Sequence, residues 1–246
     1  MNIIKGEEAT REAMFKTMGG WTTQFDIDGV PVGGHIDILT KDPRLIYHLT
    51  VVGGAKDKRI LELGPLEGAH TKMMVEAGAK EVIAVEGNPD CFLRCLIVKE
   101  AFQLTNAKFL FGDFNLYVKN YTGEKFDFIS AAGVLYHQIN PAELIHNMAK
   151  ITDCVIVWAQ VASENFPSNI EAVVASNGIT YKGKLNSYRG TRATSEVYCG
   201  GLSDDAFWMY PGEMLKCFRD AGFVNIDEQP MGATVHGVCI TFVASK

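Results

Sequence analysis

The stretch Arg-Ile-Leu-Glu-Leu-Gly-Pro-Leu-Glu-Gly-Ala-His, at residues 59–70, constrains the fold more than any other part of the chain. Apolar residues at 60, 61 and 63 are typical of a strand that is covered on both faces. Gly64 permits a sharp turn, and Gly68 permits a close approach of the backbone to another group. Apolar residues then recur at helical spacing over 71–77. The stretch therefore predicts a buried strand, a tight glycine loop and the start of a helix.

A second apolar strand, over 81–86, follows and ends in Glu86. The acid lies roughly twenty residues after the glycines, as it does in the general plan of a nucleoside-binding βαβ unit. A carboxylate in that position can accept hydrogen bonds from both ribose hydroxyls. The unit therefore predicts a nucleoside site.

The loop sequence Gly-Pro-Leu-Glu-Gly indicates which nucleoside. A dinucleotide site uses Gly-x-Gly-x-x-Gly because a pyrophosphate lies against bare amides and a helix N-terminus. Here Pro65 removes an amide donor, and Glu67 puts a negative charge where phosphates would lie. The loop suits a ligand with adenine and ribose but no phosphate, namely S-adenosylmethionine with its sulfonium and amino-acid end.

Three segments resemble the motifs of class I S-adenosylmethionine-dependent methyltransferases, in the order and spacing of that superfamily. They are Leu-Glu-Leu-Gly-Pro-Leu-Glu-Gly at 61–68, Val-Glu-Gly-Asn at 85–88 and Phe-Gly-Asp-Phe at 111–114. The resemblance implies a Rossmann-like α/β fold with a seven-stranded, mostly parallel sheet, helices on both faces and an antiparallel last strand. It implies S-adenosylmethionine as cofactor and S-adenosylhomocysteine as product. The cofactor-binding residues that follow are Glu62, Gly64, Pro65, Leu66, Gly68, His70, Glu86, Gly87, Asn88, Gly112, Asp113, Phe114 and Gly133.

Two of these residues have alternative interpretations. Asp113 directly follows the third strand, at the sheet edge where open α/β sheets bind ligands. Its carboxylate can accept from the adenine amino group, with Phe114 packed on the ring, or it can act as a helix N-cap. His70 is close to the glycine loop and is expected either to touch the cofactor's amino-acid end or to face solvent.

The run Gly-Val-Leu-Tyr-His at 133–137 follows the fourth strand, where class I methyltransferases bring the substrate to the methyl group. With the Asn-Pro pair and helix that come next, it resembles the tRNA wobble-uridine carboxymethyltransferases and their relatives. Tyr136 and His137 are therefore the catalytic candidates. A histidine titrates near neutrality and can take a proton from an acceptor hydroxyl. The alternative is a histidine that only orients the loop.

We interpret residues 1–246 as a single methyltransferase domain in four segments. A lead-in over 1–57 precedes the nucleoside-binding half, 58–160, and a substrate insertion over 161–207 precedes the C-terminal helix and hairpin, 208–246.

The lead-in contains Trp21 and Phe25 near an Asp-Gly pair, which predicts a hairpin turn. A helix is expected over 43–52, with Asp42 as its cap and a proline at its first position. The two aromatic residues are expected to wall the cofactor cleft on the substrate side, or alternatively to pack on the main core.

The insertion is longer than most loops in compact domains, and loops of that length are usually functional. Tyr188, Arg189 and Arg192 are candidates for the acceptor pocket, where an arginine can grip a carboxylate or phosphate. The alternative is a solvated loop whose charges do nothing specific. Trp208, just before the last helix, is expected to close the pocket or to anchor that helix.

Composition narrows the function. The net charge of −6 does not indicate a general nucleic-acid binder. No signal peptide, membrane-spanning run, Cys-x-x-Cys pair or metal-ligand spacing is visible, so we expect a cytoplasmic protein with buried free thiols, no bound metal and no membrane partner.

The leading hypothesis is methyl transfer to an oxygen or nitrogen of a small molecule by in-line displacement. The alternative is a tRNA-modifying methyl- or carboxymethyltransferase that acts on a uridine, with S-adenosylmethionine or carboxy-S-adenosylmethionine as donor. A third interpretation is a binding module without transfer. The sequence pattern favours no particular oligomeric state.

Overall fold

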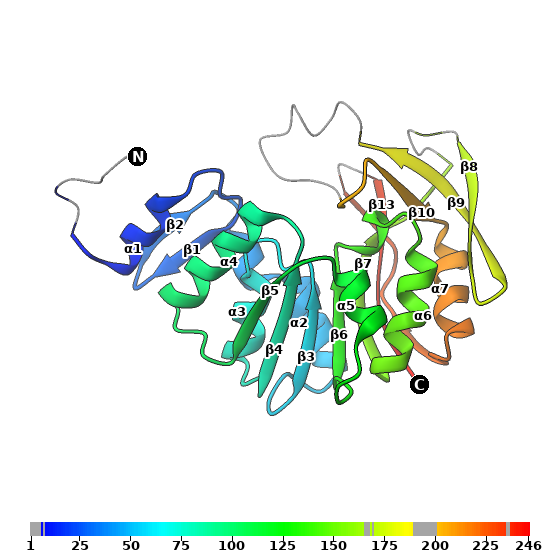
Figure 1. Cartoon of the computed structure of the whole chain (residues 1–246), viewed down its shortest axis with the longest axis horizontal. Coiled ribbons are helices and arrows are strands. Elements are labelled where there is room, and N and C mark those ends of the chain that lie inside the picture. Colours follow the sequence, from blue (N-terminus) through cyan, green and yellow to red (C-terminus); the bar gives the residue numbers. More distant parts are fainter. Residues whose placement is uncertain (1–5, 7, 165–167, 169, 189–200, 235–236) are drawn as a thin grey trace.

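The computed structural model describes residues 6, 8–164, 168, 170–188, 201–234 and 237–246 (Figure 1). A central β-sheet has helices on both faces, and a smaller sheet lies beyond one end of it. No helix within these ranges is long and apolar enough to cross a membrane.

Seven strands of the described chain form the main path of the central sheet. In spatial order they are β11 (Asn225–Glu228), β13 (Gly237–Ser245), β7 (Cys154–Gln160), β6 (Phe128–Ala132), β3 (Arg59–Leu63), β4 (Glu81–Glu86) and β5 (Ala107–Phe111). The strands from β7 to β5 are parallel, whereas β13 is antiparallel to both β7 and β11. The predicted fold class is confirmed. A short strand, β12 (Gly232–Thr234), pairs with β13 beside this path.

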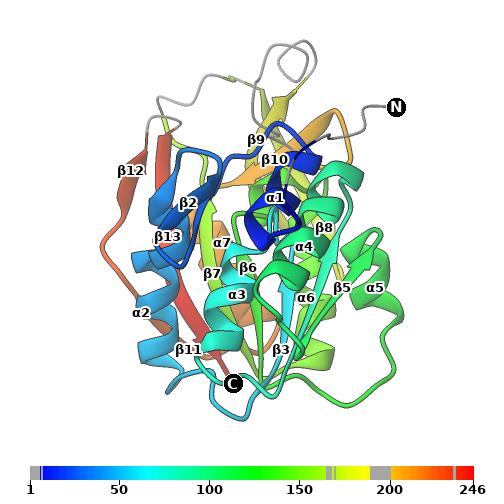
Figure 2. The ribbon, with the colours of Figure 1, turned by 90° about the vertical axis from the view of Figure 1, so that its left-hand side faces the viewer.

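Helices pack on both faces because the buried strands are apolar on both. One face carries α2 (Pro43–Val51), α3 (Ala69–Glu76) and α4 (Pro89–Ala101), and the other carries α5 (Phe114–Asn120), α6 (Pro141–Ile151) and α7 (Pro211–Asp220) (Figure 2). Successive side chains of a strand alternate between the faces. Ile60 therefore joins the cluster under α2 and α3, and Leu61 joins the one under α5 and α6.

The lead-in folds over the face that carries α3 and α4 (Figure 2). Before α2, the lead-in consists of α1 (Arg11–Met14), η1 (Phe15–Thr17), the hairpin of β1 (Gln24–Ile27) and β2 (Val30–Gly33), and η2 (Asp37–Lys41). Asp28 and Gly29 turn the hairpin with φ values of 52° and 87°, the conformation that the Asp-Gly pair predicts. Asp42 caps α2 by accepting from the Arg44 amide, also as predicted.

The described part of the insertion forms a sheet of its own. Strands β8 (Glu171–Ser176), β9 (Ile179–Ser187) and β10 (Asp205–Met209) are antiparallel, in the order β10-β9-β8. The sheet joins the main body at η3 (Leu135–His137), where the Phe207 amide donates to the Gln138 carbonyl at 2.7 Å. The last strand of the insertion continues past residue 207 and ends next to the helix α7.

Candidate active site

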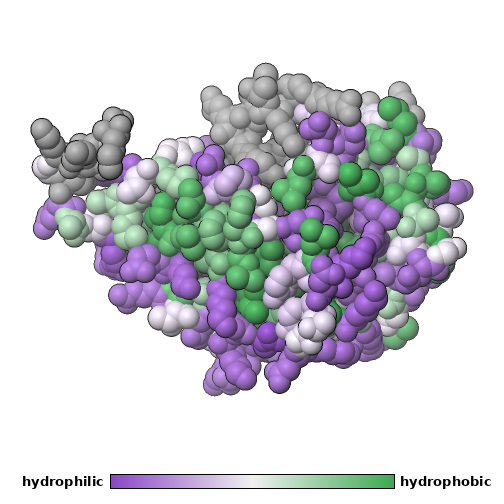
Figure 3. Space-filling view, viewed as in Figure 1, coloured by the Kyte–Doolittle hydropathy of each residue, from purple (hydrophilic) through white to green (hydrophobic). Residues whose placement is uncertain are grey.

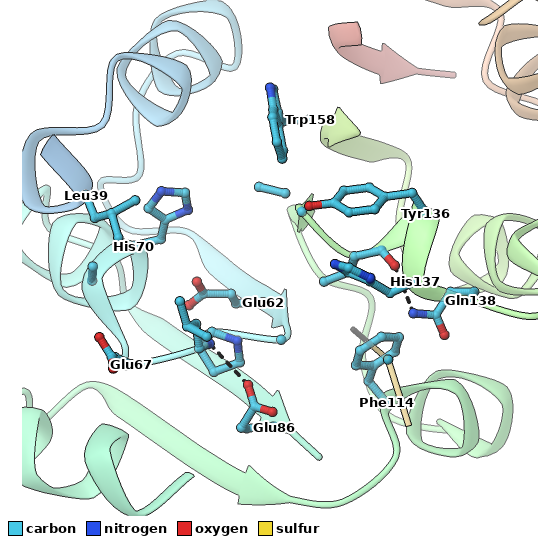
Figure 4. A pocket seen from close by; sticks show the side chains of 18 of the residues that line it. Leu39, Glu62, Glu67, His70, Glu86, Phe114, Tyr136, His137, Gln138 and Trp158 are labelled. Atoms are coloured by element: carbon cyan, nitrogen blue, oxygen red, sulfur yellow. Dashed lines mark hydrogen bonds between the residues drawn. The ribbon is translucent and has the colours of Figure 1, made fainter. Parts of the chain in front are cut away.

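A cavity of about 300 Å³ lies at the carboxyl ends of β3, β4, β6 and β7, the edge at which open α/β sheets bind ligands. Figure 4 shows Glu62, Glu67 and Glu86 on one side of it and Tyr136, His137 and Gln138 on the other. Of the predicted cofactor residues, those that line it are Glu62, Gly64, Pro65, Leu66, His70, Glu86, Phe114 and Gly133. Both catalytic candidates also line it.

The glycine loop forms the floor of the cavity and depends on its glycines. Gly64 has a φ of 60°, and a Cβ there would lie 2.9 Å from Val134 Cγ1. Gly68 has a φ of 82° where α3 begins, and a Cβ there would lie 3.2 Å from the Phe109 ring. A side chain at either position would meet both a backbone penalty and a steric one. The sharp turn predicted from the sequence is therefore present.

Glu86 is buried at the end of β4 and faces the cavity. Its carboxylate accepts from the Leu66 amide at 3.1 Å and from the Asn88 amide at 2.7 Å. Burial raises the pKa of Glu86, and these backbone hydrogen bonds oppose the rise. Because a carboxylate has about four acceptor sites, it retains capacity for a ligand's hydroxyls.

Glu62 is buried at the end of β3. It accepts a hydrogen bond from the Thr71 hydroxyl at the start of α3. Burial raises the pKa of Glu62 to about 6, against the opposing effects of His70 and Thr71. The residue offers the cavity a carboxyl group with a shifted titration.

Glu67 has a role that the sequence did not reveal. Its buried carboxylate accepts from the Thr22 amide at 2.9 Å and from the Thr23 amide at 2.7 Å, with Arg94 Nη1 at 3.9 Å. The glycine loop is thereby bonded to the lead-in, and Thr23 and Leu39 reach the cavity wall. The negative charge of Glu67 is therefore stabilised by hydrogen bonds from the lead-in.

The third motif reaches the cavity through Phe114, which was predicted, and through Asn115, which was not. Asp113 caps α5 by accepting from the Asn115 amide at 2.8 Å, and it does not line the cavity. The N-cap alternative therefore describes its contacts. Asn115 Nδ2 donates to Gln138 Oε1, another lining residue, at 2.9 Å.

Four other predicted cofactor residues do not line the cavity, namely Gly68, Gly87, Asn88 and Gly112. Asn88 caps α4 by accepting from the Cys91 amide at 3.0 Å. A Cβ on Gly87 would lie 2.7 Å from Leu202 Cδ2, so this glycine makes room for a lining residue of the insertion.

Tyr136 and His137 lie in η3, after a left-handed Gly133 with a φ of 88°. His137 Nδ1 is 2.7 Å from the Tyr188 hydroxyl, which also lies 3.4 Å from the Tyr136 carbonyl oxygen. The Tyr136 ring packs edge-on against Trp158, with centroids 5.9 Å apart. Figure 4 shows the Tyr136 hydroxyl pointing into the cavity. The two side chains can therefore meet a ligand together.

A charged cluster of Asp42, Arg44 and His70 was also not foreseen. The buried Asp42 accepts from the Arg44 side chain and lies 2.9 Å from His70 Nε2. Burial raises the pKa of Asp42, but hydrogen bonds from His70 and Arg44 outweigh it and leave the pKa well below its usual range. The Arg44 guanidinium lies 4.4 Å over the Trp158 ring. The cap signal identified Asp42, but only the fold brings His70 to it.

The predicted substrate residues that the structure describes do not line the cavity. Trp21 and Phe25 pack with Phe15 at ring distances of 4.7 and 5.6 Å, as their core alternative describes. Trp208 is buried and packs against Tyr136 at 5.3 Å, and Tyr188 lies behind His137. Arg189 and Arg192 lie outside the described residues. No cluster of metal-ligating side chains occurs in the described ranges.

The chain matches a known protein family and is similar to curated proteins. A family model described as a methyltransferase domain matches residues 44–228. Among curated proteins, the tRNA U34 carboxymethyltransferases of two Pseudomonas fluorescens strains are similar to the chain. The Pf0-1 protein is 31% identical over 140 residues, or 57% of this chain and 41% of that protein. The Pf-5 protein is 29% identical over 162 residues, or 64% and 48%. The chain thus spans less than half the length of these relatives.

Solved structures share the fold. The N-terminal domain of EvdMO1 with SAH (S-adenosylhomocysteine) bound has a TM-score of 0.74 at 23% identity, over 96% of this chain and 94% of that one. Magnesium protoporphyrin IX methyltransferase (ChlM) from Synechocystis PCC 6803, with bound SAH, has a TM-score of 0.55 at 15% identity, over 85% and 83%. The sheet order, the glycine loop with its paired acid and the matched family model lead to one conclusion: the chain belongs to the methyltransferase-domain family, within the class I S-adenosylmethionine-dependent superfamily.

Proposed function

We propose that this chain binds S-adenosylmethionine in the cavity and transfers its methyl group to an oxygen or nitrogen of a small molecule. The observation that carries the proposal is the pairing of Glu86 with the Gly-Pro-Leu-Glu-Gly loop at the carboxyl edge of the sheet. The carboxylate suits ribose hydroxyls, and the acids that line the cavity disfavour a pyrophosphate. A nucleoside without phosphates fits this set of residues.

The cofactor supplies a methyl group that is already activated on a sulfonium. The protein therefore has to orient the cofactor and the acceptor, enclose them, and remove a proton from the acceptor. Glu86 holds the ribose, and Phe114 and Leu202 enclose the adenine. Glu62 accepts from the ammonium of the amino-acid end. All four side chains line the cavity, which supports this assignment.

Tyr136 and His137 face the acceptor. His137 takes the proton of an acceptor hydroxyl, and the Tyr188 hydroxyl at its Nδ1 fixes the orientation of the ring. The Tyr136 hydroxyl offers a hydrogen bond to the acceptor at the same end of the cavity.

A small molecule is favoured as the acceptor because the described part of the insertion reaches the cavity. Gly201 and Leu202 line it, with Gly201 next to His137 and Leu202 next to Gly87. The similar EvdMO1 domain has also been solved in the presence of SAH and D-fucose, which supports a small hydroxyl acceptor. The net charge of −6 points in the same direction.

A tRNA uridine is the second candidate acceptor. The similarity to tRNA U34 carboxymethyltransferases favours it, over 57% and 64% of this chain. A gel shift with bulk tRNA at several salt concentrations separates the two candidates, since phosphate contacts give binding that weakens steeply with salt.

The proposal is tested by thermal unfolding with SAH, and with NAD as the control ligand. SAH at about a hundred times its dissociation constant should stabilise the protein by roughly 2.7 kcal/mol, and NAD should not. Glu86→Gln should lose most of the SAH shift, because the charged acceptor of the ribose is removed. Glu100→Gln, an exposed change on α4, should keep it. A shift with NAD alone would refute the proposal.

A further inference from the structure

The Arg44 side chain is held rigidly at the cavity wall. Its Nε donates to Asp42 Oδ1 at 2.9 Å and to Oδ2 at 3.0 Å, and Nη2 also bonds to Oδ2. The guanidinium lies 4.4 Å over the indole of Trp158, within the range of a cation–π contact. A long flexible side chain has thus been fixed in one orientation before any ligand binds.

This arrangement leaves one edge of the guanidinium available. Asp42 occupies the Nε/Nη2 edge, and no described residue accepts a hydrogen bond from Nη1. The side chain is 32% exposed and lines the cavity, whereas that of Asp42 is 2% exposed. An arginine carries five N–H donors, and its two Nη groups match the two oxygens of a carboxylate.

The charges around the cavity favour a singly charged anion at this edge. Glu62, Glu67 and Glu86 also line the cavity, and their charges would repel a phosphate dianion more strongly than a carboxylate. Among the described lining residues, Arg44 is the one permanently charged cation. His70 Nε2 also lies 2.9 Å from Asp42 Oδ2, so two side chains engage the Asp42 carboxylate.

We propose that Arg44 is the carboxylate-binding residue of the cavity, with Asp42 as its support and Trp158 as its platform. The carboxylate belongs either to the amino-acid end of the cofactor or to an acidic acceptor. The inference rests on the proposed function, because both are ligands of a methyltransferase. It assigns to the lead-in the anion-binding task that the sequence suggested for the insertion.

The experiment measures binding by calorimetry to wild type, Arg44→Gln and Arg44→Lys. Arg219→Gln, an exposed arginine on α7, is the control. The probes are SAH, decarboxylated SAH, and benzoate or benzamide added to the SAH complex. Because Arg44→Gln leaves Asp42 with fewer partners, the double variant D42N/R44Q removes both charges of the pair and is measured alongside.

The two sources give different results. If the carboxylate is the cofactor's, Arg44→Gln weakens SAH by roughly ten- to a hundredfold and leaves decarboxylated SAH unchanged. If it is the acceptor's, SAH affinity is unchanged, and benzoate but not benzamide binds the wild-type complex and is lost in Arg44→Gln. In either case Arg44→Lys recovers only part of the binding, since an ammonium lacks the planar pair of N–H donors that matches the two carboxylate oxygens.

Two other results separate failure of this inference from failure of the proposed function. Equal binding of every probe by wild type, Arg44→Gln and D42N/R44Q overturns the role of Arg44 while leaving the cofactor site intact. If wild type binds neither SAH nor decarboxylated SAH, the proposed function itself fails, and this inference fails with it.

Discussion

At the scale of single residues, the buried Glu62 should give the protein a measurable pH dependence. Its pKa of about 6 in the folded chain exceeds the value of 4.5 for a free glutamate, so the folded state binds the proton more tightly. Stability from this group is therefore greatest at low pH and declines as pH rises from 4.5 to 6. The decline amounts to about 2 kcal/mol at pH 7.

The test compares wild type with Glu62→Gln, which keeps the shape and an acceptor for the Thr71 hydroxyl. Denaturant unfolding at pH 4.5 and pH 7 should show that wild type loses about 2 kcal/mol relative to the variant over that range. Parallel pH curves for the two proteins would mean that Glu62 titrates normally. The other carboxylates titrate in both proteins, so their contributions cancel in the comparison.

At the scale of elements, Gly87 and Leu202 connect the end of β4 to the insertion. A Cβ at Gly87 would come within 2.7 Å of Leu202 Cδ2, and the backbone there imposes no positive φ. Gly87→Ala should therefore displace Leu202 from the cavity wall and weaken SAH binding severalfold. In a Leu202→Ala background the same change should cost little, because the methyl group then has space. Additive losses in the double-mutant cycle would show that the two residues act independently.

The elements also show where sequence reasoning succeeds and fails. The strand-loop-helix unit at 59–76, the Asp-Gly hairpin and the Asp42 cap depend on local chemistry, so their patterns predicted them. The sheet in the insertion and the Glu67–Thr22 bonds did not follow, because β9 pairs with β10 across intervening chain and Glu67 meets a segment 45 residues away. For the same reason, the sequence predicted the local structure around Asp113 and Trp21 but not whether either side chain lines the cavity.

At the scale of the whole molecule, the cavity is assembled from segments far apart in the sequence. Thr23 and Arg44 come from the lead-in, Glu86 comes from the nucleoside-binding half, and Leu202 comes from the insertion. Glu67 links the lead-in to the glycine loop by accepting from the Thr22 and Thr23 amides. A ligand that contacts both sides should therefore suppress separation of the lead-in from the loop, since binding favours the closed arrangement.

Hydrogen exchange measures this coupling directly. SAH should slow exchange of the Thr22 and Thr23 amides, whereas amides of β11, at the far edge of the sheet, should change little. Glu67→Ala removes the acceptor of both amides, so their exchange should become fast and the effect of SAH on them should diminish. Glu76→Ala, an exposed change on α3, should behave as wild type. If SAH left the Thr22 and Thr23 amides unchanged while it bound, the lead-in would be a fixed wall, and the coupling through Glu67 would be absent.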